Sequence, residues 1–311
     1  SLRGGDGGGN DCSHQVGTTP RKRKLIMQLE GFYDHRTATI TYVGWDEKTR
    51  DAFVIDPVLD YDPVGSKIFT ESVDRLTTFL KNKNLNLHLI LETHAHADHL
   101  SGAQTLKVAY PDAKVAISNR ITQVQEIFHS ALGLGDEVAT DGSQFDLLFD
   151  DNAVLQAGSL SLKSIPTPGH TPACTSYLIG DILFTGDALF MPDVGTGRCD
   201  FPAGSASDLY DSIYDGLYAL SDDTRVFVGH DYPTPGREVQ FESTLGEEKA
   251  KNIQLTSKTQ KDEYIAMREA RDATLAAPKL LYQSIQVNID AGHLPHHAPN
   301  EKSFLRVPLN Q

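Results

Sequence analysis

The segment THAHADHL, residues 93–100, places three histidines and one aspartate within six positions. It follows residues 85–91, in which leucine occupies every second position, a pattern that predicts a strand with one buried face. Neutral imidazole and carboxylate groups crowded at a strand end are typical of a metal site. The chain must therefore fold so that further ligands meet this loop, and the candidates in it are His94, His96, Asp98 and His99.

Three more ligand-type residues stand at the ends of later predicted strands. They are His170 in TPGHT, Asp187 in ILFTGD and His230 in RVFVGH. Imidazole and carboxylate ligands suit zinc, iron, manganese or nickel. Because the chain has only three cysteines, an all-sulfur metal site is excluded. Loops at strand ends are the usual place to build a site on a rigid frame, so we expect these residues to converge.

The predicted elements alternate between strands and helices, which indicates an α/β layered fold. A hairpin is expected over residues 37–55 and a helix over 72–84, and Ser101 is a candidate N-cap for a helix after it. Two short strands should turn at Gly180-Asp181. We predict a disordered Gly-rich tail at 1–24, a catalytic domain at 25–245 and a helical extension packed on it at 246–311.

Composition and charge limit the partners and the compartment. The 311 residues carry a formal net charge of −14, which argues against binding to nucleic acid or to an anionic membrane. No apolar run approaches the roughly 20 residues that span a bilayer. Sparse cysteines favour a reducing compartment, so we expect a cytoplasmic protein, with the mitochondrial matrix as the alternative. The sequence leaves the oligomeric state open and is compatible with a homodimer.

The motifs THAHADH, GHT, GD and GHD, in this order and spacing, resemble the metallo-β-lactamase superfamily over roughly residues 37–245. The resemblance implies a four-layer αββα sandwich with up to two metals at one edge of its two sheets. It would place His94, His96 and His170 at one metal and Asp98, His99 and His230 at the other. Asp187 would lie between the two metals.

Longer stretches, among them TPGHTPACTSYLIGD and LFTGDALFMPDVGTGRCDFPAG, are similar to glutathione persulfide dioxygenases. That resemblance implies one Fe(II) per chain, held by His94, His170 and Asp187, and oxidation of glutathione persulfide with O₂ to sulfite and glutathione. The other four ligand-type residues would then support the iron ligands or remain unused.

The alternative is a hydroxyacylglutathione hydrolase of the glyoxalase II type, which would hold two zinc ions and cleave a thioester. That family normally carries a second histidine in GHT-x-G-H. Ala173 and Cys174 stand at the corresponding positions here, and this departure favours the dioxygenase.

Glutathione carries two carboxylates, so an acidic protein needs specific cations to bind it. Arg198 is the first candidate, because a guanidinium can bind a carboxylate through two hydrogen bonds. Tyr232, which follows His230 closely, is the second candidate. Arg268 and Arg271 are expected on a solvated helix surface. Cys199 adjoins Arg198, and a positive neighbour could lower the pKa of its thiol.

Overall fold

A computed structural model describes residues 27–295 and 302–309 of the chain. The predicted tail at 1–24 lies outside the described residues. Within them, no helix is both long enough and apolar enough to cross a membrane.

The first sheet holds six strands in the order β1-β2-β3-β6-β8-β9. Its first three strands are antiparallel, and β3, β6, β8 and β9 run parallel to one another. A small sheet, β5-β4-β7, stands beside it. The strands of these two sheets are β1 Met27–Tyr33, β2 Ile40–Asp46, β3 Asp51–Ile55, β4 Val58–Asp62, β5 Lys67–Phe69, β6 Asn86–Leu91, β7 Leu100–Ser101, β8 Lys114–Ser118 and β9 Leu147–Phe149.

The second six-stranded sheet takes its strands in sequence order, from β10 to β15. All neighbouring pairs are antiparallel except β13 and β14, which are parallel. Its strands are β10 Val154–Ala157, β11 Leu160–Pro166, β12 Thr175–Ile179, β13 Ile182–Phe184, β14 Arg225–Phe227 and β15 Glu242–Thr244.

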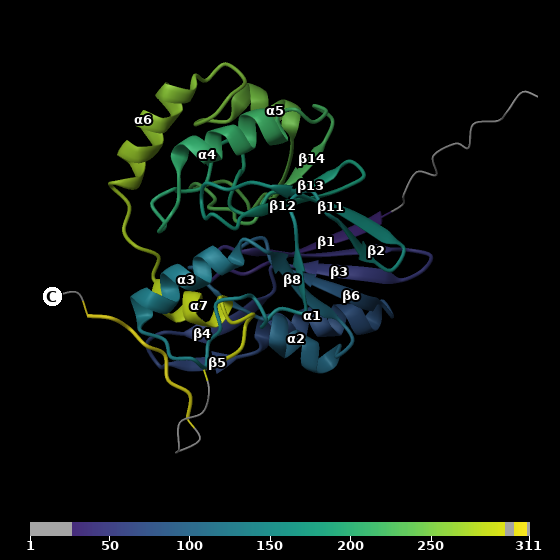
Figure 1. The fold of residues 1–311 in the computed structure, drawn as a ribbon. Coiled ribbons are helices and arrows are strands. Elements are labelled where there is room, and N and C mark those ends of the chain that lie inside the picture. Colours follow the sequence, from purple (N-terminus) through teal and green to yellow (C-terminus); the bar gives the residue numbers. More distant parts are fainter. Residues whose placement is uncertain (1–26, 296–301, 310–311) are drawn as a thin grey trace, which may run out of the picture.

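Helices cover the outer faces of both sheets (Figure 1). The helices α1 to α3 lie on the side of the first sheet, and α4 and α5 on the side of the second. Two later helices, α6 and α7, contact α4 and β7 respectively. The helices are α1 Glu71–Asn82, α2 Ala103–Ala109, α3 Ile121–Leu132, α4 Ala206–Asp211, a π-helix Ser212–Leu217, α5 Leu245–Lys251, α6 Lys261–Asp272 and α7 Leu281–Asn288.

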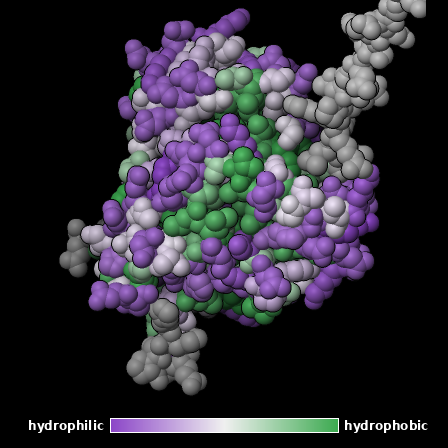
Figure 2. Space-filling model, turned by 45° about the vertical axis from the view of Figure 1, so that its right-hand side comes forward, coloured by the Kyte–Doolittle hydropathy of each residue, from purple (hydrophilic) through white to green (hydrophobic). Residues whose placement is uncertain are grey.

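Strand alternation sorts the apolar side chains into two cores. In β3, Phe53 and Ile55 face the second sheet and join the core between the two sheets. Ala52 and Val54, on the opposite face of the same strand, pack with the helices outside it. This is the period-2 pattern of a strand buried on both faces. The expected αββα sandwich is therefore confirmed. On the surface, Figure 2 shows apolar side chains gathered in the middle of one face of the molecule.

Most predicted elements are present, with two corrections. The strand before THAHADHL and the turn at Gly180-Asp181 are confirmed. Ser101 is not the N-cap of α2, because it pairs with Val58 in the short strand β7 and Gly102 takes the cap position. The strand β1 was not predicted. The domain boundaries at 25–245 and 246–311 stay a prediction.

The junction after β15 contains a buried carboxyl group, Glu248. Its oxygens accept hydrogen bonds from the hydroxyl of Ser243 at 2.5 Å and the amide of Asn252 at 2.9 Å. Burial raises the pKa of Glu248 from 4.5 to about 7, although both hydrogen bonds act in the opposite direction. The folded protein therefore retains a proton there that the unfolded chain releases at lower pH.

This proton predicts a pH-dependent stability difference between the wild type and Glu248→Gln. As the pH rises from about 4.5 to 7, the unfolded state binds fewer protons than the folded state, so the wild type loses about 1.4 kcal/mol per pH unit relative to the variant. Urea unfolding of both proteins at pH 5, 6, 7 and 8, in the same metal state, measures it. Parallel stability curves would contradict the assignment.

Candidate metal centre

Three ligand-type side chains from three strand ends face one another. His94 follows β6, His170 follows β11 and Asp187 follows β13. The Asp187 Oδ2 atom lies 4.0 Å from His94 Nε2 and 3.6 Å from His170 Nε2. One ligand atom from each residue lies within 4.8 Å of the others, so the three side chains can hold one ion.

Hydrogen bonds on the far side of each ring aim the two histidines at this point. His170 Nδ1 lies 2.7 Å from the carbonyl oxygen of Arg198, which can only accept, so Nδ1 carries the hydrogen. His94 Nδ1 lies 3.0 Å from Thr93 Oγ1, whose own hydrogen is donated to Asp56. In the neutral form of each ring, Nε2 is then the nitrogen whose lone pair can bind a metal.

A second group stands beside the first. His96, Asp98 and His230 also offer ligand atoms within 4.8 Å of one another. His230 Nε2 lies 3.4 Å from Asp98 Oδ2 and 3.3 Å from Asp187 Oδ1. Asp187 therefore adjoins both groups through its two oxygens. His99 lies next to Asp98, with its Nδ1 atom 3.5 Å from Asp98 Oδ2, but the second group contains His96 in its place.

His230 is held in place by contacts across the two sheets. The backbone N–H of Ile40 donates to the carbonyl of Gly229 at 2.8 Å. The hydroxyl of Tyr42, in the core, donates to the carbonyl of Val228 at 2.6 Å. Strand β2 of the first sheet thus fixes the loop that follows β14 of the second.

Two buried carboxyl groups lie behind His96, and sequence reasoning missed both. His96 Nε2 is 3.0 Å from Asp56 Oδ1 and 3.5 Å from Glu92 Oε2. Ser101 donates a hydrogen bond to Glu92. Burial raises the pKa of Glu92 to about 7. The available signal was position: Asp56 directly follows β3, and Glu92 directly precedes THAHADH.

The unpaired atoms of the site test whether it fits a metal. Buried polar atoms normally have a partner, because an unpaired one costs free energy. Within residues 27–295 and 302–309, several buried imidazole nitrogens at the site have neither a hydrogen-bond partner nor a carboxylate within 3.5 Å. They are His94 Nε2, His96 Nδ1, His99 Nε2 and His230 Nδ1, and the carboxylate of Asp187 lies beside them. Such a set of imidazoles and a carboxylate fits a bound cation.

Burial and charge adjust the histidines differently. Burial, reinforced by neighbouring imidazoles, holds the pKa of His94 well below its ordinary value, which favours the neutral form that ligates metals. Burial also lowers the pKa of His230, but the charges of Asp187 and Asp98 outweigh it and raise the pKa overall. Without an ion, the carboxylates therefore favour a proton on His230.

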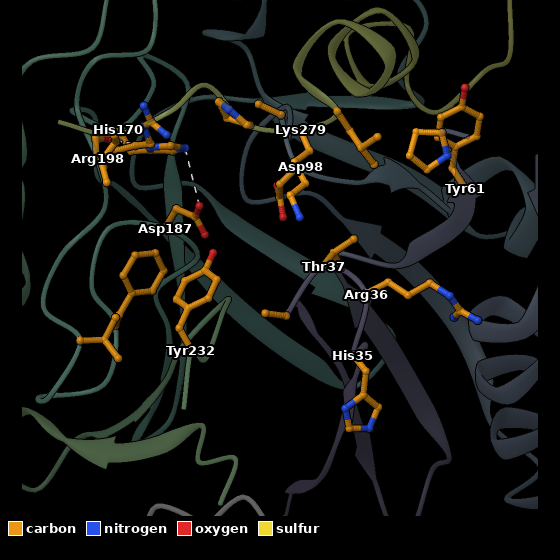
Figure 3. Close-up of a pocket in the computed structure, with 18 of the residues that line it drawn as sticks. His35, Arg36, Thr37, Tyr61, Asp98, His170, Asp187, Arg198, Tyr232 and Lys279 are labelled. Carbon is orange, nitrogen blue, oxygen red and sulfur yellow. Dashed lines mark hydrogen bonds and ion pairs between the residues drawn. The ribbon is translucent and has the colours of Figure 1, made fainter. Parts of the chain in front are cut away.

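A cavity of about 1250 Å³ opens over the first group (Figure 3). Its walls include Asp98, His170 and Asp187. Tyr61 lies across the cavity from Asp187 in this view, and the hydroxyl of Tyr232 points toward Asp187. The volume exceeds the roughly 300–1,000 Å³ of a typical small-molecule pocket, so a tripeptide thiol has room beside the metal ligands.

The two predicted substrate residues both line this cavity. Arg198 Nε and Nη2 bind the two oxygens of Asp200 at 2.6 Å, and Nη1 donates to the carbonyl of Ala276. Its guanidinium therefore already has a carboxylate partner within the chain. Tyr232 is 49% exposed and stacks on His230, with ring centroids 5.8 Å apart. Substrate binding by either residue stays a prediction.

Two expectations for neighbouring residues were wrong. Arg268 is only 2% exposed and contacts Asp272, the carbonyl of Thr196 and Gln254. The spacing of Arg268 and Asp272, four residues apart on one helix, was the available signal. The pKa of Cys199 is raised, because burial and the charge of Asp272 outweigh the charge of Arg268.

Comparison with known proteins agrees with this geometry. The model of the Metallo-beta-lactamase superfamily matches residues 37–230. Glyoxylase B2 of Dictyostelium discoideum is 45% identical over 91% of this chain and 97% of its own length. A probable metallo-hydrolase of Burkholderia pseudomallei is 42% identical over 91% of this chain and 99% of its own.

Dioxygenase relatives are more distant. Persulfide dioxygenase ETHE1 of Homo sapiens is 31% identical over 73% of this chain and 76% of its own. The crystal structure of ETHE1 from Myxococcus xanthus is 32% identical, with a TM-score of 0.68, and the match covers 86% of this chain and all of that one. By name and identity, the curated relatives favour the hydrolase alternative over the dioxygenase.

The shared position of Asp187 predicts which substitution removes the metal. Asp187→Ala deletes the one carboxylate of the first group, and two neutral imidazoles hold a dication poorly. We expect the bound metal to fall at least about tenfold. His230→Ala should keep most of the metal if His94, His170 and Asp187 hold it. Elemental analysis after gel filtration measures both, with circular dichroism as the folding control. Equal loss in the two variants would contradict a one-ion site.

Proposed function

Because this chain belongs to the metallo-β-lactamase superfamily, we propose that it uses the metal centre at its sheet edge to oxidise glutathione persulfide. The reaction is glutathione persulfide plus O₂ and water giving glutathione, sulfite and two protons. One Fe(II) per chain would be held by His94, His170 and Asp187. When bound, that ion supplies open coordination positions on which persulfide sulfur and O₂ can meet.

One observation carries the proposal: the first group is a complete two-histidine, one-carboxylate set that opens onto the cavity. Such a set with open positions is typical of non-haem Fe(II) oxygenases. The carbonyl of Arg198 orients the ring of His170, and the hydroxyl of Thr93 orients the ring of His94. Neither hydrogen bond involves a residue of the second group. The structural match to ETHE1 from Myxococcus xanthus supports the same assignment.

The residue at the position of the second histidine in the hydrolase motif also supports the dioxygenase proposal. Cys174 occupies the place of the second histidine in GHT-x-G-H, and it is buried beside Thr171. Burial raises the pKa of its thiol to about 12, so it remains a neutral thiol, which is a poor metal ligand.

A glyoxalase II type hydrolase with two zinc ions is the second candidate. The observation that favours it is the second group, His96, Asp98 and His230, which Asp187 joins to the first. The names of the more similar relatives favour it as well. In that case Asp187 would lie between two ions, and the reaction would be thioester hydrolysis.

The two candidates predict opposite results for one protein preparation. Protein purified without O₂ should contain about one iron per chain, consume O₂ when given glutathione persulfide, and release sulfite. It should hydrolyse S-lactoylglutathione only slowly. Elemental analysis, an oxygen electrode and a thioester assay provide the measurements. Two zinc ions per chain with fast thioester cleavage and no O₂ uptake would replace the dioxygenase proposal with the hydrolase.

A further inference from the structure

The cations around the cavity fall into two classes. The cavity is lined by six basic side chains, and carboxylates within the chain neutralise three of them. Arg36 pairs with Asp60 and Glu71, Arg198 with Asp200, and Arg268 with Asp272.

The other three basic side chains are Lys67, Arg271 and Lys279. All three are exposed at the cavity, and none has a side-chain hydrogen bond or ion pair to another of the described residues. In a chain with a net charge of −14, three unpaired cations around one cavity are the ones available to an anionic ligand.

These cations stand on separate elements. Lys67 begins β5, in the hairpin that β5 forms with β4. Arg271 lies in the last turn of α6, and Lys279 lies in the segment between α6 and α7. In Figure 3, the hairpin residue Tyr61 lies across the cavity from Asp187, whereas Lys279 lies nearer the metal ligands, beside Asp98. The cations of the hairpin and of the C-terminal segment can therefore bind different parts of one ligand.

The β4–β5 hairpin places Lys67 opposite Asp62 in the strand register. The two oxygens of Asp62 accept the backbone N–H groups of Val64 and Gly65, at 3.0 and 3.1 Å, so this carboxylate stabilises the turn.

We propose that Lys67 of the hairpin, and Arg271 and Lys279 of the C-terminal segment, determine specificity by binding one carboxylate each of a thiol substrate that carries two carboxylates. This inference rests on the proposed function, since the sulfur end of the substrate would lie at Asp187. Two separated cation sites select thiols with two distant anionic groups, such as the glutathione tripeptide. Arg198 then acts as a structural residue that orients His170.

Binding of S-methylglutathione, which carries both carboxylates but no persulfide, tests the inference without turnover. Titration calorimetry would compare the metal-loaded wild type with Lys67→Gln, with Arg271→Gln/Lys279→Gln, and with Lys114→Gln. Lys114 is exposed and lies outside the cavity, so it is the matched control. We expect Kd to rise about fivefold in Lys67→Gln and more in the double variant, with no change in the control.

A probe without the glycine carboxylate identifies which carboxylate each element binds. S-methylglutathione amidated at its glycine keeps the rest of the ligand but lacks that charge, so substitutions on the element that binds the glycine carboxylate should no longer change its affinity. The other element should keep its full effect.

If the wild type binds S-methylglutathione but Lys67→Gln matches the control, or if substitutions at both cation sites still weaken binding of the amidated probe equally, the two-site inference is wrong and the proposed function stands. If the wild type neither binds S-methylglutathione nor consumes O₂ with the persulfide, both fail together.

Discussion

The apolar contact between the two six-stranded sheets determines where every ligand residue lies. Side chains such as Phe53 and Ile55 from the first sheet pack against Tyr177 and Phe184 from the second. Burying this surface fixes the two sheets relative to each other, so the loops at their shared edge have little freedom. Hydrogen bonds across the packed sheets, such as that from Tyr42 to the carbonyl of Val228, then fix individual loops of the polar site.

The same packing removes the ionisable groups of the site from water, which shifts their pKa values. Burial holds the pKa of His94 well below its ordinary value, whereas at His96 burial is outweighed by the charges and hydrogen bonds of Asp56 and Glu92, which raise the pKa. The histidines and carboxylates at the edge are mostly buried, which costs free energy. Fixed neighbours compensate for part of this cost: the Arg198 carbonyl supports His170, and Asp56 supports both Thr93 and His96. The partners that remain missing are those that an ion would supply.

Local patterns in the sequence were sufficient for many of the elements and for the crowded loop after β6. Leucine at alternate positions predicted β6, and the crowding of His94 to His99 predicted a polar strand end. Contacts between distant segments could not be predicted from the sequence. Ser101 looked like a helix cap because its pairing with Val58 spans more than forty residues. Arg268 looked solvated because the carbonyl of Thr196 that it binds comes from a distant loop.

Close contacts between backbone segments could not be predicted from the sequence either. Gly197 follows the ligand Asp187 by ten residues, and a Cβ atom at this position would overlap the carbonyl oxygen of Asp187. A glycine in a Gly-rich loop suggests flexibility, whereas here it allows a tight contact. The sequence alone does not distinguish these two uses.

The origin of the ligands gives the metal a mechanical role. His94, His96, Asp98 and His99 follow a strand of the first sheet, whereas His170, Asp187 and His230 follow strands of the second. Neither sheet by itself carries all three residues of either group. An ion bound here therefore links the two sheets through its ligands. Because separation of the sheets would release the ion, the free energy of unfolding should increase with the concentration of free metal.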